Sequence, residues 1–374
     1  MRITAAVSVL APQLAWIAKL LPARPPIPVL AGVRLDVAED QVRLTGTDYD
    51  TWGSATVEAD TEGAGAVVLP GRLLAALVAE LPSRYLVTLD VEDHQVRVSC
   101  GKTRATLRTL PAEDYPTPPD RPVAIGQIDA DVLAAGVGRV APSASADSTL
   151  TMLTGVHLVL SDGGLLLEAS DRYRFTRDVL GWEPTLDGAV DNDVLVPRDA
   201  LVAASRAMTG TVSIGLQDEG AAPVALALSD ATRHLSTRLL SDGFLNVDKV
   251  LAMLGEVSAE VTVESEPLTA AIRRTRLFAA DSVPLRIEVG DGELVVRAGA
   301  EGDAGADTVS AQTEAEEPLA VAIRADYLLD ALAATRHERT RLSVSTPTKP
   351  VLVRSDDDED TGFFHIVMPI RQTS

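Results

Sequence analysis

The side chains able to do catalytic chemistry are few and lie far apart in the sequence. The five histidines form no pair at the spacing of metal ligands. They are His94, His157, His234, His337 and His365. The chain also lacks a phosphate-binding P-loop and a G-x-S-x-G nucleophile turn. These absences argue against an enzyme and favour a binding protein that needs no cofactor and no metal.

A cysteine thiol and an acidic run could also take part in catalysis or metal binding, but a structural role is favoured for each. The single cysteine, Cys100, lies in the alternating stretch VRVSCGKTRATL, which predicts a strand thiol packed in a core. One cysteine excludes an intramolecular disulfide and is typical of a reducing cytoplasm. The acidic run 356–360 could bind a divalent cation. A solvated acidic loop is favoured there, because nothing rigid shapes the run.

The net charge of −21 opposes nucleic-acid binding at first sight, since phosphate contacts need basic side chains. The charge is unevenly distributed, however. The segments with helical periodicity carry a net charge of +6, and the rest of the chain carries −27. These segments are 11–24, 70–84, 129–142, 198–208, 267–281 and 324–341. A weakly basic helical surface favours a protein that slides on DNA, with retention by closure around the duplex and not by tight phosphate contacts.

An internal repeat organises the chain. The pattern VLAGVRL at 29–35 returns as MLTGVHL at 152–158, which aligns Gly32 with Gly155 at an offset of 123 residues. The same offset aligns Asp48 with Asp171. A strand that runs into a helix occurs three times, at 67–82, 194–208 and 321–335. The sequence therefore predicts three domains, at 1–122, 123–253 and 254–374.

Each repeat is expected to fold as an α+β domain with two helices and about eight mainly antiparallel strands. Alternating apolar residues flank Asp and Gly turns at 87–100, 156–170 and 285–299, which is typical of β-hairpins. Pro12, Gln13 and Lys19 interrupt the apolar N-terminal region, so neither a signal peptide nor a membrane span is expected.

Eight stretches along the chain resemble the bacterial sliding clamp family, the beta subunit of DNA polymerase III, with the closest likeness to actinobacterial members. They are LPARPPIPVLAGVRL (21–35), LTGTDYD (44–50), RTLPAEDYPTPP (108–119), TMLTGVHL (151–158), SDRYRF (170–175), VLVPRDAL (194–201), STRLLSDGF (236–244) and HIVMPIR (365–371). Their order and the threefold repeat make a chance match improbable.

The resemblance implies a non-enzymatic cytoplasmic processivity factor that forms half of a closed ring. Two chains would join head to tail around double-stranded DNA, with helices lining the hole. DNA polymerase and the clamp loader would bind through short linear peptides, and no membrane would be involved. The DNA-facing residues would be Lys19, Arg24, Arg72 and Arg198. The dimer interface would contain Ala105, Thr106, Leu107, Leu277 and Phe278, with Ala105 smaller than the usual family residue.

The family's peptide site lies between the second and third domains. Carried over residue by residue, the peptide site comprises Leu153, Ser170, Arg172, Tyr173, Arg174, Phe175, Leu245, Val250, Arg324, Tyr327, Thr348, Ile366, Met368, Pro369, Ile370 and Arg371. Apolar side chains there would accept apolar anchors, and the Tyr and Arg side chains would fix polar groups. Taken without the family, most of these residues would be interpreted as ordinary core.

Two residues depart from the family pattern in the peptide site. Leu245 replaces the usual Pro, and Arg324 replaces the usual Asn. Both changes should alter which peptides or pocket-directed inhibitors bind. One hypothesis is therefore a specialised paralogue that tolerates an inhibitor of the standard clamp, with antibiotic resistance as its role. An acidic protein-binding scaffold that does not bind DNA is a further alternative, and an enzyme ranks third.

Overall fold

The computed structural model describes residues 1–185, 192–219, 222–279, 283–299, 303–315, 317–335, 337–356 and 362–370. Contacts divide the chain into two compact units. Unit 1 comprises Met1–Ala134, Trp182–Val190 and Asp199–Leu239. Unit 2 comprises Ala135–Gly181, Asp191–Arg198 and Leu240–Ser374. This division passes through the middle repeat, so the boundaries of the three expected domains stay a prediction.

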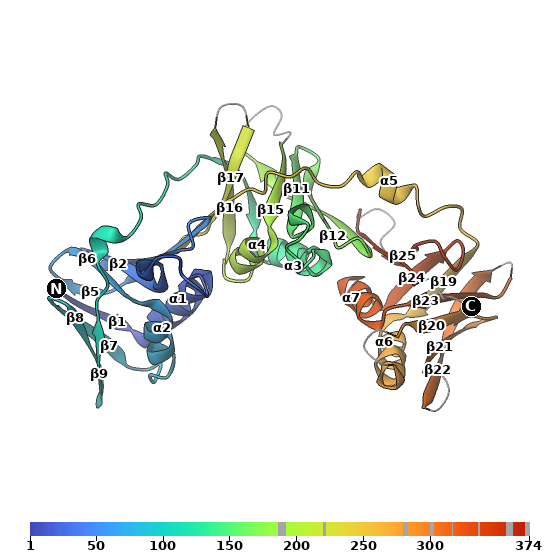
Figure 1. Cartoon of the computed structure of the whole chain (residues 1–374), viewed down its shortest axis with the longest axis horizontal. Coiled ribbons are helices and arrows are strands. Elements are labelled where there is room, and N and C mark those ends of the chain that lie inside the picture. Colours follow the sequence, from blue (N-terminus) through green and yellow to red (C-terminus); the bar gives the residue numbers. More distant parts are fainter. Residues whose placement is uncertain are drawn as a thin grey trace. The chain divides into compact units, whose positions relative to one another are not determined.

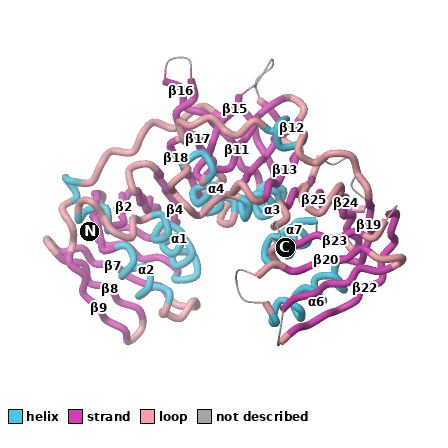
Figure 2. Tube along the Cα trace, turned by 45° about the vertical axis from the view of Figure 1, so that its right-hand side comes forward, coloured by secondary structure: helices cyan, strands magenta, loops and turns pink. Residues whose placement is uncertain are grey.

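Unit 1 contains two antiparallel sheets and the helices α1 (Val7–Leu20) and α2 (Gly71–Ala79), which pack side by side (Figures 1 and 2). The five-stranded sheet has the order β5 (Asp60–Glu62), β1 (Arg2–Ala6), β7 (Leu86–Glu92), β8 (Gln95–Cys100) and β9 (Thr103–Arg108). The nine-stranded sheet has the order β14 (Glu183–Pro184), β10 (Ala124–Asp129), β16 (Thr211–Glu219), β17 (Ala222–Ser229), β18 (Arg233–Arg238), β4 (Thr51–Glu58), β3 (Gln41–Thr47), β2 (Gly32–Ala38) and β6 (Gly65–Pro70). Strand β9 therefore forms a sheet edge.

Helix α1 begins four residues before the stretch that the sequence indicated. Ala6 precedes it without a side-chain cap, and the Val7 N–H donates to the Tyr85 carbonyl at 3.0 Å. Proline is common at the first position of a helix, so Pro12 indicated a later start. In the structure Pro12 lies inside α1, on its exposed side. Tertiary contacts supply the start of α1 that no local signal marks.

Unit 2 is built on one twelve-stranded antiparallel sheet. Its order is β15 (Asn192–Pro197), β11 (Gly155–Ser161), β12 (Gly164–Ser170), β13 (Arg174–Leu180), β26 (Phe364–Val367), β25 (Val351–Ser355), β24 (Arg339–Val344), β19 (Ala259–Glu264), β22 (Ala304–Ala315), β21 (Glu293–Gly299), β20 (Leu285–Val289) and β23 (Leu319–Ile323). The β13–β26 pairing joins strands of the middle repeat to strands of the last one.

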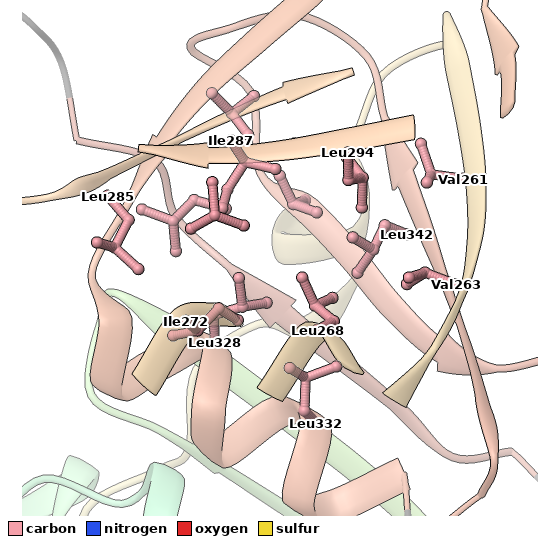
Figure 3. Close-up of a cluster of buried hydrophobic side chains, with 14 of the residues drawn as sticks. Val261, Val263, Leu268, Ile272, Leu285, Ile287, Leu294, Leu328, Leu332 and Leu342 are labelled. Atoms are coloured by element: carbon pink, nitrogen blue, oxygen red, sulfur yellow. The ribbon is translucent and has the colours of Figure 1, made fainter. Parts of the chain in front are cut away.

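The core of unit 2 lies between this sheet and the helices α6 (Ser265–Thr275) and α7 (Ala325–Thr335). Buried residues of α6 recur at Leu268, Ala271, Ile272 and Thr275, the spacing of one helix face. Figure 3 shows Leu268 and Ile272 with Leu328 and Leu332 of α7, facing strand residues such as Ile287. The α+β class expected from alternation and helical periodicity is confirmed.

Two further helices, α3 (Ala130–Val140) and α4 (Arg198–Ser205), also lie where the sequence placed them. The short helix α5 (Val247–Leu251) was not expected. Asn246 caps it, because its side-chain oxygen accepts the Lys249 N–H at 3.0 Å.

The repeated aspartates form the same turn in each copy. The Asp48 carboxylate accepts the N–H groups of Asp50 and Thr51, at 3.1 and 2.7 Å. The Asp171 carboxylate accepts those of Tyr173 and Arg174, at 2.9 and 3.0 Å. The residue after each aspartate has a positive φ, 82° for Tyr49 and 79° for Arg172. The Asp at this offset therefore recurs because it stabilises a left-handed turn residue.

Candidate functional site

Strand pairing brings the two main segments of the peptide site together. Phe175 of β13 lies opposite Ile366 of β26. The Met368 N–H donates to the Tyr173 carbonyl at 2.7 Å, which continues the pairing beyond the strand. The Ile370 N–H donates to the Ala322 carbonyl at 2.7 Å and ties the same segment to β23, the strand that precedes α7. Residues almost two hundred positions apart therefore form one surface within unit 2.

The Arg174 guanidinium connects three parts of this surface. It pairs with Asp171 at 3.0 Å and with Asp330 of α7 at 2.5 Å, and it donates to the Pro142 carbonyl. Its side chain is only 12% exposed. A guanidinium with fixed donors suits this bridging position better than an ammonium group would. Arg174 thus holds the turn after β12 against α7.

Tyr327 lies between two guanidinium groups. Arg174 lies 4.6 Å and Arg324 4.8 Å from the centre of its ring. Burial, followed by the Asp171 charge, raises the pKa of the Tyr327 hydroxyl. Arg324, one of the two departures from the family pattern, therefore covers an aromatic side chain of the peptide site.

The sixteen residues of the peptide site differ in accessibility. Four are buried and form a supporting core: Leu153, Ser170, Phe175 and Ile366. Seven are half-buried: Arg174, Leu245, Val250, Tyr327, Met368, Pro369 and Ile370. Four are exposed: Arg172, Tyr173, Arg324 and Thr348. Arg371 lies outside the described residues. If a peptide binds at this expected site, the half-buried and exposed groups are the ones within its reach.

Sequence reasoning missed a charged ladder beside this site. His157 on β11 hydrogen-bonds Glu168 on β12 at 2.9 Å and Asp193 on β15. Glu168, only 1% exposed, also pairs with Arg177 on β13 at 2.5 Å. The Phe244 ring stacks on His157 at 4.7 Å, directly before Leu245. We call His157, Glu168, Arg177 and Asp193 the His157 ladder. Its alternating charges lie on four adjacent strands, and no local motif marks it.

The His157 ladder predicts a pH dependence of stability. Burial opposes the charged imidazolium, but the bonds to Glu168 and Asp193 outweigh burial and raise the pKa of His157. Since the folded pKa exceeds the unfolded one of about 6.5, this stabilisation is complete below about pH 6.5 and is lost as pH rises through the folded pKa. We expect His157→Gln to lower the free energy of unfolding more at about pH 6 than at about pH 9.

Chemical denaturation of both proteins at the two pH values measures this difference. Burial lowers the pKa values of His234 and His365 to about 4 and about 3. Both histidines occur in both proteins, so their contributions to the pH dependence of stability cancel in the comparison. A difference that is independent of pH, or larger at high pH, would contradict a stabilising imidazolium.

The four expected DNA-facing cations fall into two kinds. Lys19 and Arg24 are exposed and make no hydrogen bond or ion pair with the described residues. Arg72 donates to the carbonyls of Leu21 and Pro22 at 2.6 and 3.2 Å, so it braces the loop that carries Arg24. Arg198 donates to the Ala144 carbonyl at 3.4 Å. Arg72 and Arg198 lie in the first turns of α2 and α4. A positive charge there interacts unfavourably with the helix dipole. Helix stability therefore does not explain why arginine occurs at these two positions.

The expected interface residues lie at two places, in strand β9 of unit 1 and in the short 3-10 helix Arg276–Phe278 of unit 2. Ala105, Thr106 and Leu107 belong to β9, and of these only Leu107 is buried. Leu277 and Phe278 are 80% and 45% exposed. Phe278 covers Gly305 of β22, where an added Cβ would clash with the ring.

Other possible sites receive no support from the described residues. They contain no group of three or more His, Cys, Asp or Glu side chains placed to hold a metal. Of the acidic run, Asp356 pairs with Arg341 at 2.7 Å, and 357–360 lie outside the described part. Cys100 is buried, as expected for a strand thiol. No helix in the described segments has the length and apolar character needed to cross a membrane.

Comparisons with known proteins agree along the whole chain. Models of the N-terminal, central and C-terminal domains of the DNA polymerase III beta subunit match residues 1–119, 127–244 and 255–371. The beta sliding clamp of Streptomyces coelicolor is 36% identical over 378 residues, which cover 99% of each chain. The chain belongs to the DNA polymerase III beta subunit family. The expected resemblance is confirmed.

Two other relatives extend the comparison with this family. The beta sliding clamp homolog GriR of Streptomyces muensis is 31% identical over 370 residues, 97% of each chain. A Pseudomonas aeruginosa sliding clamp bound to griselimycin has a TM-score of 0.89 and 25% identity, with 100% of both chains covered. The clamp fold is therefore confirmed. As a sliding clamp, the chain is a DNA-replication protein and a processivity factor, and it is not an enzyme.

Proposed function

We propose that two copies of this sliding clamp close head to tail around duplex DNA in the cytoplasm and tether a DNA polymerase. The main support for this function is the match of three clamp-domain models, in order and over nearly the whole chain. The three domains would follow the predicted boundaries 1–122, 123–253 and 254–374. Primer extension on a primed circle, with a clamp loader and polymerase, tests it: the clamp should lengthen the products. Products of unchanged length would refute it.

Exposed cations support a sliding contact with DNA. Lys19 and Arg24 are free to meet phosphates, and Arg72 holds the Arg24 loop in place. A few such contacts give weak, sequence-independent attraction that lets the duplex move.

Replacing Arg24 with Ala tests this contact. We expect Arg24→Ala to weaken DNA-dependent loading, most strongly at low salt, where the phosphate contact is least screened, and to change the free energy of unfolding by less than about 0.5 kcal/mol. Loading assays at two salt concentrations and a denaturation curve measure both effects. A loss of several kcal/mol in stability would show that Arg24 has a structural role instead.

Two free strand edges support ring closure. In the part of the chain that the structure describes, strand β9 pairs only with β8. On β22, Ala304–Ser310 pairs with β21, whereas β19 pairs only with Ala311–Ala315. One edge of Ala304–Ser310 therefore has no strand partner among the described residues. If β9 paired with this edge in a second copy, the unpaired backbone groups of both strands would find hydrogen-bond partners. Leu277 and Phe278 would pack beside the paired strands.

A second candidate role is a specialised clamp that tolerates a pocket-directed inhibitor. Arg324 stacks on Tyr327, and Leu245 follows the Phe244 ring that stacks on His157. Both residues that differ from the family pattern therefore change side chains that a bound peptide or inhibitor would contact. The likeness to the homolog GriR and to a clamp that binds griselimycin fits this role.

Restoring the usual proline tests the specialised role. We expect Leu245→Pro to bind a standard clamp-binding peptide about tenfold more tightly, because Pro limits the freedom of the unbound segment. Isothermal titration of one peptide into both proteins measures the difference. Equal, tight binding by both proteins would exclude a specialised pocket.

A further inference from the structure

A cavity of about 460 Å³ opens in unit 1. Strands β3, β4 and β18 form its floor, and residues 118–121 cover it. In the strand register Ser54 lies between Thr45 and His234, and Trp52 lies opposite Ser236. These positions share one face of the sheet, because alternate residues point the same way. The other face, with Gly46 and Gly53, packs against α1.

Two cations without a carboxylate partner line this cavity. Arg43 and Arg121 make no ion pair with the described residues. The Arg121 guanidinium reaches only the Ser54 hydroxyl, at 3.4 Å. Asp120 is the one carboxylate in the lining and does not pair with either arginine. The cavity therefore keeps an excess of positive charge, which an anion would neutralise.

His234 adds a buried polar atom to the same wall. Its side chain is nine-tenths buried, and its Nδ1 hydrogen-bonds the Ser229 hydroxyl at 2.7 Å. The other ring nitrogen, Nε2, has no partner among the described residues. His234 itself belongs to the cavity lining. His234 thus offers one unpaired hydrogen-bonding atom beside the two guanidinium groups.

Trp52 supplies a flat, half-buried surface at the floor of the cavity. Indole rings stack well on planar rings, and Arg groups bind phosphate through paired N–H donors. The volume lies within the usual range of about 300–1,000 Å³ for small-molecule sites. We propose that this cavity binds a small molecule that combines a phosphate group with a planar ring, of the nucleoside-monophosphate class. Arg43 and Arg121 hold the phosphate, and Trp52 contacts the ring.

Titration of the full-length protein with adenosine monophosphate, adenosine and inorganic phosphate tests this site, read by calorimetry and tryptophan fluorescence. We expect the monophosphate to bind at least about tenfold more tightly than either part alone. Arg121→Gln and Arg43→Gln should each weaken binding about tenfold or more, and Trp52→Phe should weaken it less. Arg84→Gln, at an exposed arginine outside the cavity lining, is the matched control and should change nothing.

Thermal melting of each variant separates loss of the site from loss of the fold. Weaker binding by Arg121→Gln and Arg43→Gln at unchanged melting temperature supports the site. The proposal is overturned if the protein binds none of the three probes. It is also overturned if phosphate binds as tightly as the monophosphate, or if Arg84→Gln weakens binding as much as Arg121→Gln.

Discussion

Thr106→Pro is expected to convert the clamp dimer into monomers. The β8–β9 turn closes with the pair Cys100 and Thr103, and the Thr109 N–H bonds the His94 carbonyl at 3.0 Å. Hydrogen-bonded pairs alternate along the hairpin, so the N–H groups of Arg104, Thr106 and Arg108 point to the free edge. Proline at 106 removes one of these donors without removing a bond to β8.

The expected loss is large because, in the proposed ring, the free edge of β9 would provide the backbone pairing between subunits. Each backbone hydrogen bond contributes about 1 kcal/mol, and the proline ring also keeps the partner strand away, so we expect at least about 100-fold weaker dimerisation. Light scattering after gel filtration should show the mass falling from twice 39.4 kDa to 39.4 kDa. Thr106→Val keeps the N–H and should stay dimeric. A dimeric Thr106→Pro protein would place the interface elsewhere.

Arg174→Met is expected to cause the second large effect, on both stability and peptide binding. The substitution leaves Asp171 without its ion pair and removes the link from β13 to Asp330 of α7. It also uncovers one face of Tyr327. Removing one partner of a largely buried charged network costs about 3 kcal/mol in unfolding free energy. Peptide affinity should fall strongly, because the turn at 171–173 and α7 lose their common anchor.

Arg172→Met is the matched control for this experiment. Arg172 is two residues away and exposed, and its guanidinium lies 5.7 Å from the centre of the neighbouring Tyr173 ring. We expect its unfolding free energy to change by less than about 0.5 kcal/mol. Chemical denaturation and peptide titration of both variants provide the comparison. Equal losses of stability would show that Arg174 does not join the two segments.

Local patterns in the sequence predicted most of the elements that position these residues. Six helices and three hairpins lie where periodicity indicated, because amphipathic spacing and Asp or Gly turns are encoded within a few residues. The aligned Asp48 and Asp171 proved to stabilise equivalent turns. Strand β9 lies at a sheet edge, and its place in the dimer interface stays a prediction.

Long-range contacts could not be predicted in the same way. Arg174 and Asp330 are 156 residues apart, and only the β13–β26 pairing brings their segments together. His157 has two polar neighbours, Glu168 and Asp193, on adjacent strands, and their register is fixed by the whole sheet. Nothing in the residues around Arg43 or Arg121 indicates that one cavity unites them. Such sites depend on which strands are neighbours, and strand neighbours follow from tertiary packing.

Retention on closed circular DNA tests encirclement most directly. The clamp, loaded onto a nicked circle by a clamp loader, should remain bound through gel filtration at a salt concentration that abolishes weak phosphate contacts. Cutting the circle once should then release it, because the ring slides off the free ends. Thr106→Pro should not be retained on either form. Retention that persists after linearisation would contradict topological binding, as would failure of the loaded wild-type clamp to stay on the circle.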